Sequence, residues 1–200
     1  TAWREMKKDE EPPITNHFYD KPFPRETDAP TPLWDKLLSY QLSPACVIVL
    51  QALIGRILFP LKKWDNWAVF LFLHGHAGTG KSTVIDIACD FLPKGTVGVI
   101  TCTQEKKFGL EALRSKRIVC FPDIPPNFHE LLPQADFQVM VDGTGVNVAR
   151  KNKTAINNKP WKAPFIGAGN YIPGYDDRSG NYSRRTVTFE FVNHITVKDT

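Results

Sequence analysis

One eight-residue segment, residues 75–82, constrains this chain more than any other. It reads Gly-His-Ala-Gly-Thr-Gly-Lys-Ser and matches the pattern GxxxxGK[ST] in full. Glycines at these positions let the backbone curl so that successive N–H groups point at one anion. The lysine can reach the β- and γ-phosphates of a triphosphate, and the serine hydroxyl can ligate Mg²⁺. The segment therefore predicts a phosphate-binding loop.

The residues on both sides of this segment fit such a loop. Residues 67–73 form an apolar run typical of a buried strand, and residues 82–88 have helical character. A helix N-terminus would then face the phosphates. The alternative is a glycine-rich turn that matches by chance, and the order strand, loop, helix argues against it. We expect ATP and Mg²⁺ as ligands, with the nucleotide bound by Gly75, His76, Ala77, Gly78, Thr79, Gly80, Lys81, Ser82 and Thr83.

Composition limits the class of protein and its compartment. The chain has 200 residues, 42% of them hydrophobic and 12% aromatic, enough for a buried core. Its formal net charge of +4 permits a polyanionic partner without requiring one. The four cysteines lack metal-ligand spacing, and neither a signal peptide nor a bilayer-spanning apolar run is visible. We expect a cytoplasmic or nuclear protein that does not contact a membrane.

Three regions of different composition divide the chain. Residues 1–30 are rich in charge and proline and predict an extended arm or linker. Residues 31–65 contain Thr31-Pro32 and Ser43-Pro44, two helix-start signals, and predict a small helical segment. Residues 66–200 alternate strand-like and helix-like runs, which predicts a three-layer α/β core with a central parallel sheet. Core strands are expected at 67–73, 96–101, 117–121, 165–168 and 186–191, and the arms of a hairpin at 146–150 and 161–165.

Two polar residues follow core strands at the sheet edge where ligands gather. Asp123 comes just after residues 117–121 and could hold Mg²⁺ or polarise an attacking water. Asn170 ends the run from Pro164, and its amide could orient that water. Both residue types are also common in turns, so a turn role is the alternative for each. The position of Asp123 at a strand end favours the functional interpretation.

Two groups of basic residues complete the candidate set. Arg184 and Arg185 precede the last strand and could reach a phosphate on a neighbouring subunit, although a solvated basic strand start is the more common explanation for two such residues taken alone. Basic residues around the expected hairpin tip, together with Trp161, suit a nucleic-acid backbone with some base stacking. A charge cluster on a loop is more often ordinary surface. The hairpin candidates are Arg150, Lys151, Lys153 and Lys162.

In this order, the motifs resemble those of the superfamily 3 helicases, above all the primase-helicase branch of large DNA viruses, with poxvirus-type, phage and plasmid relatives. The resemblance covers roughly residues 31–192. Its most specific part lies between Val141 and Phe191. That part contains Asp142-Gly143, the Lys151 region, Ala168-Gly169-Asn170-Tyr171-Ile172-Pro173 and Arg184-Arg185.

The resemblance implies an AAA+-like P-loop NTPase that assembles as a ring, usually a hexamer, and translocates 3′ to 5′ on single-stranded DNA. It implies a sensor role for Asn170, and for Arg184 or Arg185 the role of a finger supplied to the neighbour's ATP. The hairpin around Lys151 would grip DNA. A primase, upstream or in trans, would be a further partner, and an infected host cell the compartment of a viral protein.

The chain departs from the family at its second motif. The family often has two adjacent acids there, whereas Pro122-Asp123 supplies one. Asp123 could serve both tasks, or a second carboxylate could contribute, with Glu105 and Glu130 as candidates.

We therefore expect an ATP-dependent DNA helicase core of viral or mobile-element replication. Two alternatives stay open. One is a DNA-packaging or loading motor that does not unwind. The other is a nucleotide-binding regulatory module without salt-dependent affinity for single-stranded DNA.

Overall fold

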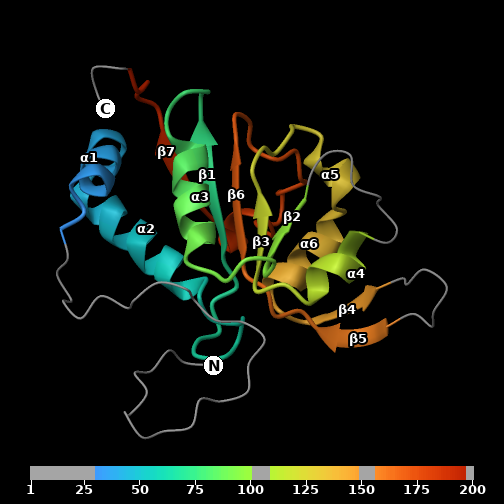
Figure 1. The fold of residues 1–200 in the computed structure, drawn as a ribbon. Coiled ribbons are helices and arrows are strands. Elements are labelled where there is room, and N and C mark those ends of the chain that lie inside the picture. Colours follow the sequence, from blue (N-terminus) through green and yellow to red (C-terminus); the bar gives the residue numbers. More distant parts are fainter. Residues whose placement is uncertain (1–29, 101–108, 149–155, 197–200) are drawn as a thin grey trace, which may run out of the picture.

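The computed structural model describes residues 30–100, 109–148 and 156–196. Two helices come first, and strands and helices then alternate along the chain (Figure 1). The elements are α1 (Pro32–Gln41), α2 (Pro44–Arg56), β1 (Phe70–Gly75), α3 (Lys81–Asp90), β2 (Val97–Val99), α4 (Gly109–Arg114), β3 (Ile118–Phe121), α5 (Phe128–Leu131), α6 (Gln134–Val141), β4 (Gly145–Val148), β5 (Ile156–Pro160), β6 (Phe165–Gly169), η1 (Ser183–Arg185) and β7 (Thr186–Phe191).

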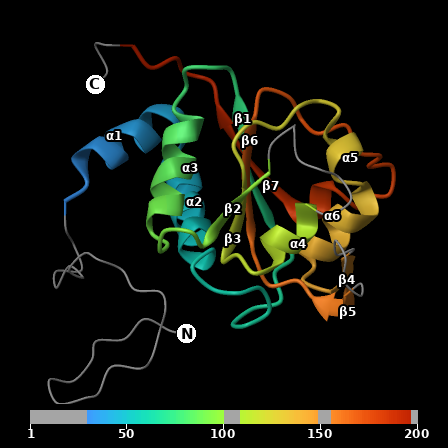
Figure 2. The same cartoon turned by 45° about the vertical axis from the view of Figure 1, so that its right-hand side comes forward.

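Five of the strands form one parallel sheet in the order β2–β3–β6–β1–β7. Helices cover both of its faces, α1 to α3 on one side and α4 to α6 on the other (Figures 1 and 2). A buried apolar core lies on each face of the sheet. Successive side chains of β1 point to opposite faces, so Leu71 and Leu73 pack on the first side and Phe70 and Phe72 on the second. The predicted three-layer α/β fold with a parallel sheet is confirmed. In the described part of the chain, every helix is too short or too polar to cross a bilayer.

The first two helices start as their sequence signals indicate. Each has proline in its first turn, and the Ser43 hydroxyl accepts a hydrogen bond from the Cys46 backbone N–H at 3.4 Å. Leu38 of α1 and Leu50 of α2 are buried in the same apolar cluster as Leu71 of the sheet. The helical segment therefore packs directly on the core, behind the phosphate loop.

The strand before the phosphate loop begins later than its apolar run suggests. Residues 67–69 lie outside β1, and Trp67 is exposed. The Asp65 carboxylate accepts a hydrogen bond from the Trp67 backbone N–H at 2.8 Å, which closes a turn two residues on. This local bond delays the strand until Phe70.

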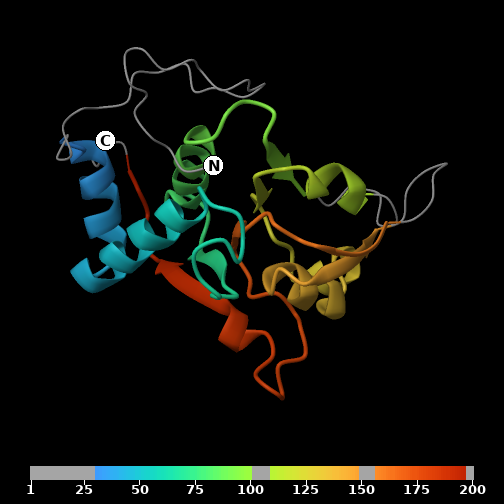
Figure 3. The ribbon, with the colours of Figure 1, turned by 90° about the horizontal axis from the view of Figure 1, so that it is seen from below.

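The hairpin differs from the prediction in its second arm. β4 pairs with β5, with Val146 opposite Lys159, so residues 156–160 form the arm that was expected at 161–165. Trp161 is only 1% exposed, and its indole N–H donates to the Ala163 carbonyl at 2.7 Å. Burying a tryptophan ring is more favourable than displaying it between two lysines, so Trp161 joins the aromatic core and cannot stack on a base. Seen from below, β4 and β5 extend away from the sheet (Figure 3).

Candidate functional site

The phosphate loop, residues 75–82, joins β1 to α3 at the edge where the parallel strands end (Figure 1). Its three glycines are required by the backbone. Gly75, Gly78 and Gly80 have φ angles of 148°, 76° and 87°, a region that L side chains rarely adopt. A Cβ atom on Gly75 would also lie 1.9 Å from the Phe191 carbonyl oxygen of β7. The glycine pattern therefore serves the shape of the loop and its close packing against β7.

Lys81 lies inside this loop and is 8% exposed. Its Nζ donates hydrogen bonds to the carbonyl oxygens of Gly75 at 2.7 Å and His76 at 2.5 Å. It also donates to the Asn170 side-chain oxygen at 3.3 Å. Burial lowers the pKa of Lys81, and the nearby Asp123 carboxylate opposes that shift. The ammonium is thus held where phosphate oxygens of a bound nucleotide would take over its hydrogen bonds.

A cavity of about 450 Å³ opens beside the loop. It brings together residues from three chain segments: the loop with the start of α3, the end of β3 and the end of β6. The lining residues are Ala77, Gly78, Thr79, Gly80, Lys81, Ser82, Thr83, Pro122, Asp123, Gly169 and Asn170. Asp123 and Asn170, which are far apart in sequence, therefore meet Lys81 at one cavity.

A short backbone contact keeps the two strand ends together. The Ile124 N–H donates to the Ala168 carbonyl at 2.8 Å, so the residue after Asp123 is bonded to β6. Gly169 allows this approach, because a Cβ there would lie 2.9 Å from the Ile124 carbonyl oxygen. The spacing between Asp123 and Asn170 is therefore set by the sheet and not by a flexible loop.

Hard oxygen donors for a magnesium ion are present at the same cavity. The Ser82 hydroxyl and the Asp123 carboxylate both line it, and both residues are exposed. Among the residues that the structure describes, no group of three or more His, Cys, Asp or Glu could hold a metal ion. Mg²⁺ commonly uses one or two protein oxygens together with nucleotide phosphates and water. The donor set fits an ion shared with a nucleotide.

Of the two candidates for a second carboxylate, only Glu130 is described, and it does not line this cavity. Glu130 lies on α5 and accepts a hydrogen bond from the Asn127 amide at 3.1 Å, on the surface. Glu105 lies outside the described residues. Within residues 30–100, 109–148 and 156–196, Asp123 is the one carboxylate that lines the cavity.

The two adjacent arginines have different environments. Arg185 is 8% exposed, and its guanidinium donates to the Asp142 carboxylate at 2.6 and 2.7 Å and to the Asn181 carbonyl at 2.8 Å. These Asp142 bonds raise the pKa of Arg185. Arg184 is exposed and forms no ion pair within the described part of the chain. Arg185 is occupied within its own chain, whereas Arg184 is available to another molecule.

Both arginines lie far from the phosphate loop of their own chain. They belong to η1, before β7, and at the other end of β7 Phe191 pairs with Gly75. Six residues of strand span about 20 Å at 3.3 Å per residue. Neither side chain can therefore reach the cavity of its own chain.

The predicted DNA-binding residues are only partly described. Arg150, Lys151 and Lys153 lie outside the described residues. Lys162 follows β5, is exposed, and its carbonyl accepts a hydrogen bond from the Leu61 N–H at 2.9 Å. In Figure 1 the hairpin lies at the end of the sheet opposite the phosphate loop.

Gln41, at the end of α1, is a site residue that sequence reasoning missed. It is 8% exposed, and its Nε2 donates to the carbonyls of Thr79 at 3.1 Å and Asn193 at 2.6 Å. Its Oε1 accepts from the Asn193 N–H at 3.0 Å. The side chain thus ties the phosphate loop to α1 and to the segment after β7. Its only signal in the sequence is its place three residues after buried Leu38, on the same helix face.

The segment after β7 also supports the loop directly. The Ile195 N–H donates to the Gly78 carbonyl at 2.9 Å. A Cβ on Gly80 would lie 2.8 Å from methyl carbons of both Leu37 and Ile195. The back of the loop is therefore held by α1 on one side and by residues 193–195 on the other.

Comparisons with known proteins give a family for this chain and structures of similar fold. A family model described as "Family of unknown function (DUF5906)" matches residues 73–185. An apo structure of the NrS-1 C-terminal region is similar at a TM-score of 0.59 and 20% identity, covering 84% of this chain and 40% of that one. A JCV helicase structure is similar at a TM-score of 0.50 and 17% identity, covering 79% of this chain and 43% of that one. Among curated proteins, none matches this sequence.

These likenesses concern the fold. This chain spans less than half the length of the NrS-1 and JCV structures. At 17–20% identity they show the fold alone, an α/β P-loop core, and the expected likeness to a helicase structure is confirmed at the level of that fold.

Proposed function

Because the chain belongs to DUF5906, a family of unknown function, and has the fold of a P-loop helicase core, we propose that it is the ATPase core of a superfamily 3 DNA helicase. Its role would lie in the replication of a virus or mobile element, with a primase in the same protein or in trans as partner. The compartment would be cytoplasm or nucleus, in an infected host cell if the source is viral. One observation carries the proposal: Lys81, Asp123 and Asn170 meet at one cavity beside the phosphate loop.

Each of these groups has a defined task on ATP. The loop N–H groups and the Lys81 ammonium bind the β- and γ-phosphates, and Lys81 leaves its carbonyl partners to do so. Ser82 and Asp123, which line the cavity, would hold Mg²⁺, and the ion would neutralise charge on the phosphates. Asn170, next to Lys81, orients the attacking water and distinguishes ATP from ADP. Asp123 accepts the proton of that water, since it is the carboxylate at the cavity.

The positions of the arginines support a shared active site. Arg184 cannot reach its own cavity but is exposed, so it serves the ATP of a neighbouring copy as a finger. Arg185 holds the base of β7 through Asp142. We propose a closed ring, a hexamer as is usual in the superfamily, because a head-to-tail contact gives a ring when the rotation between subunits closes.

One strand connects nucleotide chemistry to the hairpin. β6 starts three residues after Lys162 and ends directly before Asn170. Its five residues span about 16 Å through the buried centre of the sheet. A shift at Asn170 on hydrolysis would pass along β6 to the hairpin and move a bound single strand of DNA.

DNA-stimulated ATP hydrolysis, measured against protein concentration, tests this proposal. We expect turnover that rises with single-stranded DNA and with concentration as rings form, and unwinding of a duplex with a 3′ overhang. Stimulation without unwinding would identify a packaging or loading motor instead. ATP binding without salt-dependent DNA affinity would identify a regulatory module and contradict the proposal. Lys81→Ala serves as the inactive control.

A further inference from the structure

Two exposed tryptophans lie in the loop between α2 and β1. We call residues 61–67 the Trp64 loop. Trp64 is 67% exposed and Trp67 is 60% exposed, although tryptophan is a residue that proteins bury to a large extent. The loop lies at the underside of the molecule (Figure 3), the end of the sheet opposite the phosphate loop. Tryptophan is enriched at interfaces, where its large ring supplies contact area and its N–H can still find a partner.

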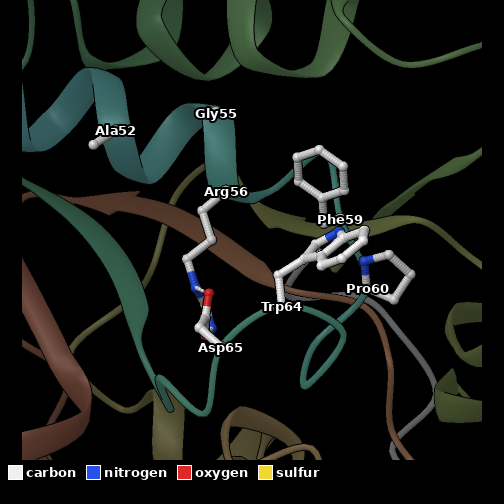
Figure 4. A pocket seen from close by; sticks show the side chains of 7 residues that line it. All are labelled: Ala52, Gly55, Arg56, Phe59, Pro60, Trp64 and Asp65. Atoms are coloured by element: carbon white, nitrogen blue, oxygen red, sulfur yellow. Dashed lines mark hydrogen bonds and ion pairs between the residues drawn. The ribbon is translucent and has the colours of Figure 1, made fainter. Parts of the chain in front are cut away.

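The Trp64 loop is held in place by an ion pair. The Arg56 guanidinium of α2 donates to the Asp65 carboxylate at 2.8 and 2.9 Å, and it also donates to the Trp67 carbonyl. The hydrogen bonds from Arg56 lower the pKa of Asp65. Figure 4 shows the Arg56 side chain extended toward Asp65, beside Trp64. The display of Trp64 is therefore preorganised, which reduces the entropy lost when a ligand binds.

A cavity of about 390 Å³ lies next to the Trp64 ring. Phe59 stands edge-on to Trp64 at 6.3 Å between ring centroids, and Pro60 lies beside it (Figure 4). One face of the indole is contacted by a cation, with the Lys63 Nζ 5.3 Å from the ring centroid. Lys62 has a φ of 61°, which is uncommon outside glycine and turns the chain sharply just before Lys63. The cavity is lined by the rings of Phe59, Pro60 and Trp64 together with the Arg56–Asp65 ion pair, so a base could stack against the indole there.

The charge around Trp64 is positive and continues onto the hairpin. Lys62 and Lys63 are exposed on the loop, and Lys159 and Lys162 are exposed at the hairpin base. The hydrogen bond from the Leu61 N–H to the Lys162 carbonyl, at 2.9 Å, joins the two. Trp64 is the third residue after Leu61, so its Cα lies within about 11 Å of the Leu61 Cα. The one acid of the loop, Asp65, is neutralised by Arg56.

We propose that the Trp64 loop and the hairpin base form one surface that binds single-stranded nucleic acid, with a base stacked on Trp64 and the four lysines near the backbone. The proposal rests on the proposed function and adds the stacking contact that buried Trp161 cannot supply. An aromatic ring and a positive groove are the two parts of sequence-tolerant single-strand binding. An exposed indole beside four lysines matches a polyanion that carries bases better than it matches a protein surface.

The test uses the full chain and a fluorescent oligo-dT. Trp64→Ala should weaken binding about tenfold, whereas Trp64→Phe, which keeps an aromatic face, should restore most of it. Leu33→Ala is the control variant. It removes an exposed apolar side chain on α1, outside the Trp64 loop, and should bind oligo-dT as tightly as the wild type does. An oligonucleotide of the same length without bases should bind wild type and Trp64→Ala equally. Unfolding curves check that each variant is folded.

Each result decides the proposal. Equal binding of oligo-dT by wild type and Trp64→Ala overturns it, while the proposed function stands if single-stranded DNA still stimulates ATP hydrolysis. An equal loss with the base-free strand overturns the stacking role. A Trp64→Ala variant that loses oligomers in sedimentation, with unchanged DNA affinity, would make the surface a subunit contact. If wild type binds no oligo-dT at low salt, the proposed function itself fails.

Discussion

The two ends of the central sheet hold their side chains in different ways. At the phosphate loop, Lys81 and Gln41 are buried and each makes several hydrogen bonds to backbone carbonyls. At the hairpin end, Trp64 and Lys162 are exposed, and the backbone beneath them carries the hydrogen bonds. A small polyanion needs a preformed cradle of N–H groups, whereas an extended polymer needs an accessible surface. The two ends of the sheet therefore differ in the way that the two proposed sites require.

The two faces of the sheet also differ in chemistry. The core under α4 to α6 is rich in aromatic rings, with Phe70 5.6 Å from Phe137 and 6.2 Å from Phe121 between ring centroids. The core under α1 to α3 is mainly aliphatic. The aromatic side carries the hairpin, and the aliphatic side carries the phosphate loop and its helix. A substitution at the phosphate loop should therefore leave nucleic-acid binding at the hairpin intact unless its effect passes along β6. The same holds for ATP binding when the substitution is at the hairpin.

The largest effect is expected for Lys81→Ala. Removal of the ammonium leaves the β- and γ-phosphates without their neutralising charge, so ATP hydrolysis should fall below detection. Binding of oligo-dT without nucleotide should persist, because the hairpin end is untouched. Phosphate release and fluorescence anisotropy measure the two. Normal turnover would show that the phosphate loop is not the catalytic site.

The second-largest effect is expected for Arg184→Ala. Turnover should fall about 10³-fold while nucleotide binding is retained, since a finger acts only on the neighbour's transferring phosphate. Mixing this variant with Lys81→Ala should restore part of the activity. A mixed ring can contain an interface with one intact loop and one intact arginine. Failure of the mixture to recover, at concentrations where rings form, would argue against a shared site.

Arg185→Ala should act on stability instead. It leaves the Asp142 carboxylate without its partner, and the cost should be about 2–3 kcal/mol, below that of a fully buried pair because Asp142 is partly exposed. Urea unfolding measures it. A normal unfolding free energy combined with lost turnover would reverse the roles that we assign to the two arginines.

Gln41→Ala should raise the KM for ATP about tenfold with a smaller change in kcat, because the loop loses its tie through Thr79 while the catalytic groups remain. Gln41→Glu keeps the acceptor for the Asn193 N–H but sets a buried carboxylate against the carbonyls of Thr79 and Asn193, so its effect should be at least as large. Tyr40→Phe, which removes a hydroxyl bonded to the His194 carbonyl at 3.3 Å on the surface, is the matched control. A kcat loss with unchanged KM would contradict this positioning role.

The smallest effect is expected for Lys162→Ala. One lost phosphate contact should reduce the slope of log binding constant against log salt by about 0.7 for single-stranded DNA, with ATP affinity unchanged. Affinities at several salt concentrations give the slope. An unchanged slope would make Lys162 ordinary surface and move the DNA contacts to the rest of the hairpin.

Short patterns in the sequence were sufficient to predict those parts of the fold whose conformation depends on neighbouring residues. The strand predicted at 186–191 coincides with β7, because its strict alternation suits a strand that packs only part of its side chains. The phosphate loop follows from glycine positions whose φ angles few other residues adopt. Asp123 and Asn170 were identified because parallel strands end at a common edge. In each case, a pattern of a few neighbouring residues carries the physical constraint.

Tertiary structure decided what depends on partners distant in the chain. Arg184 and Arg185 are equivalent in sequence, and only Asp142, which lies 43 residues before Arg185, separates their roles. The lysines around Trp161 indicate an exposed residue in the sequence, but the aromatic core buries its ring. Gln41 takes its role from its hydrogen bonds to Thr79 and Asn193. A polar or aromatic side chain takes its role from whatever desolvates and bonds it, and those groups meet only when the chain folds.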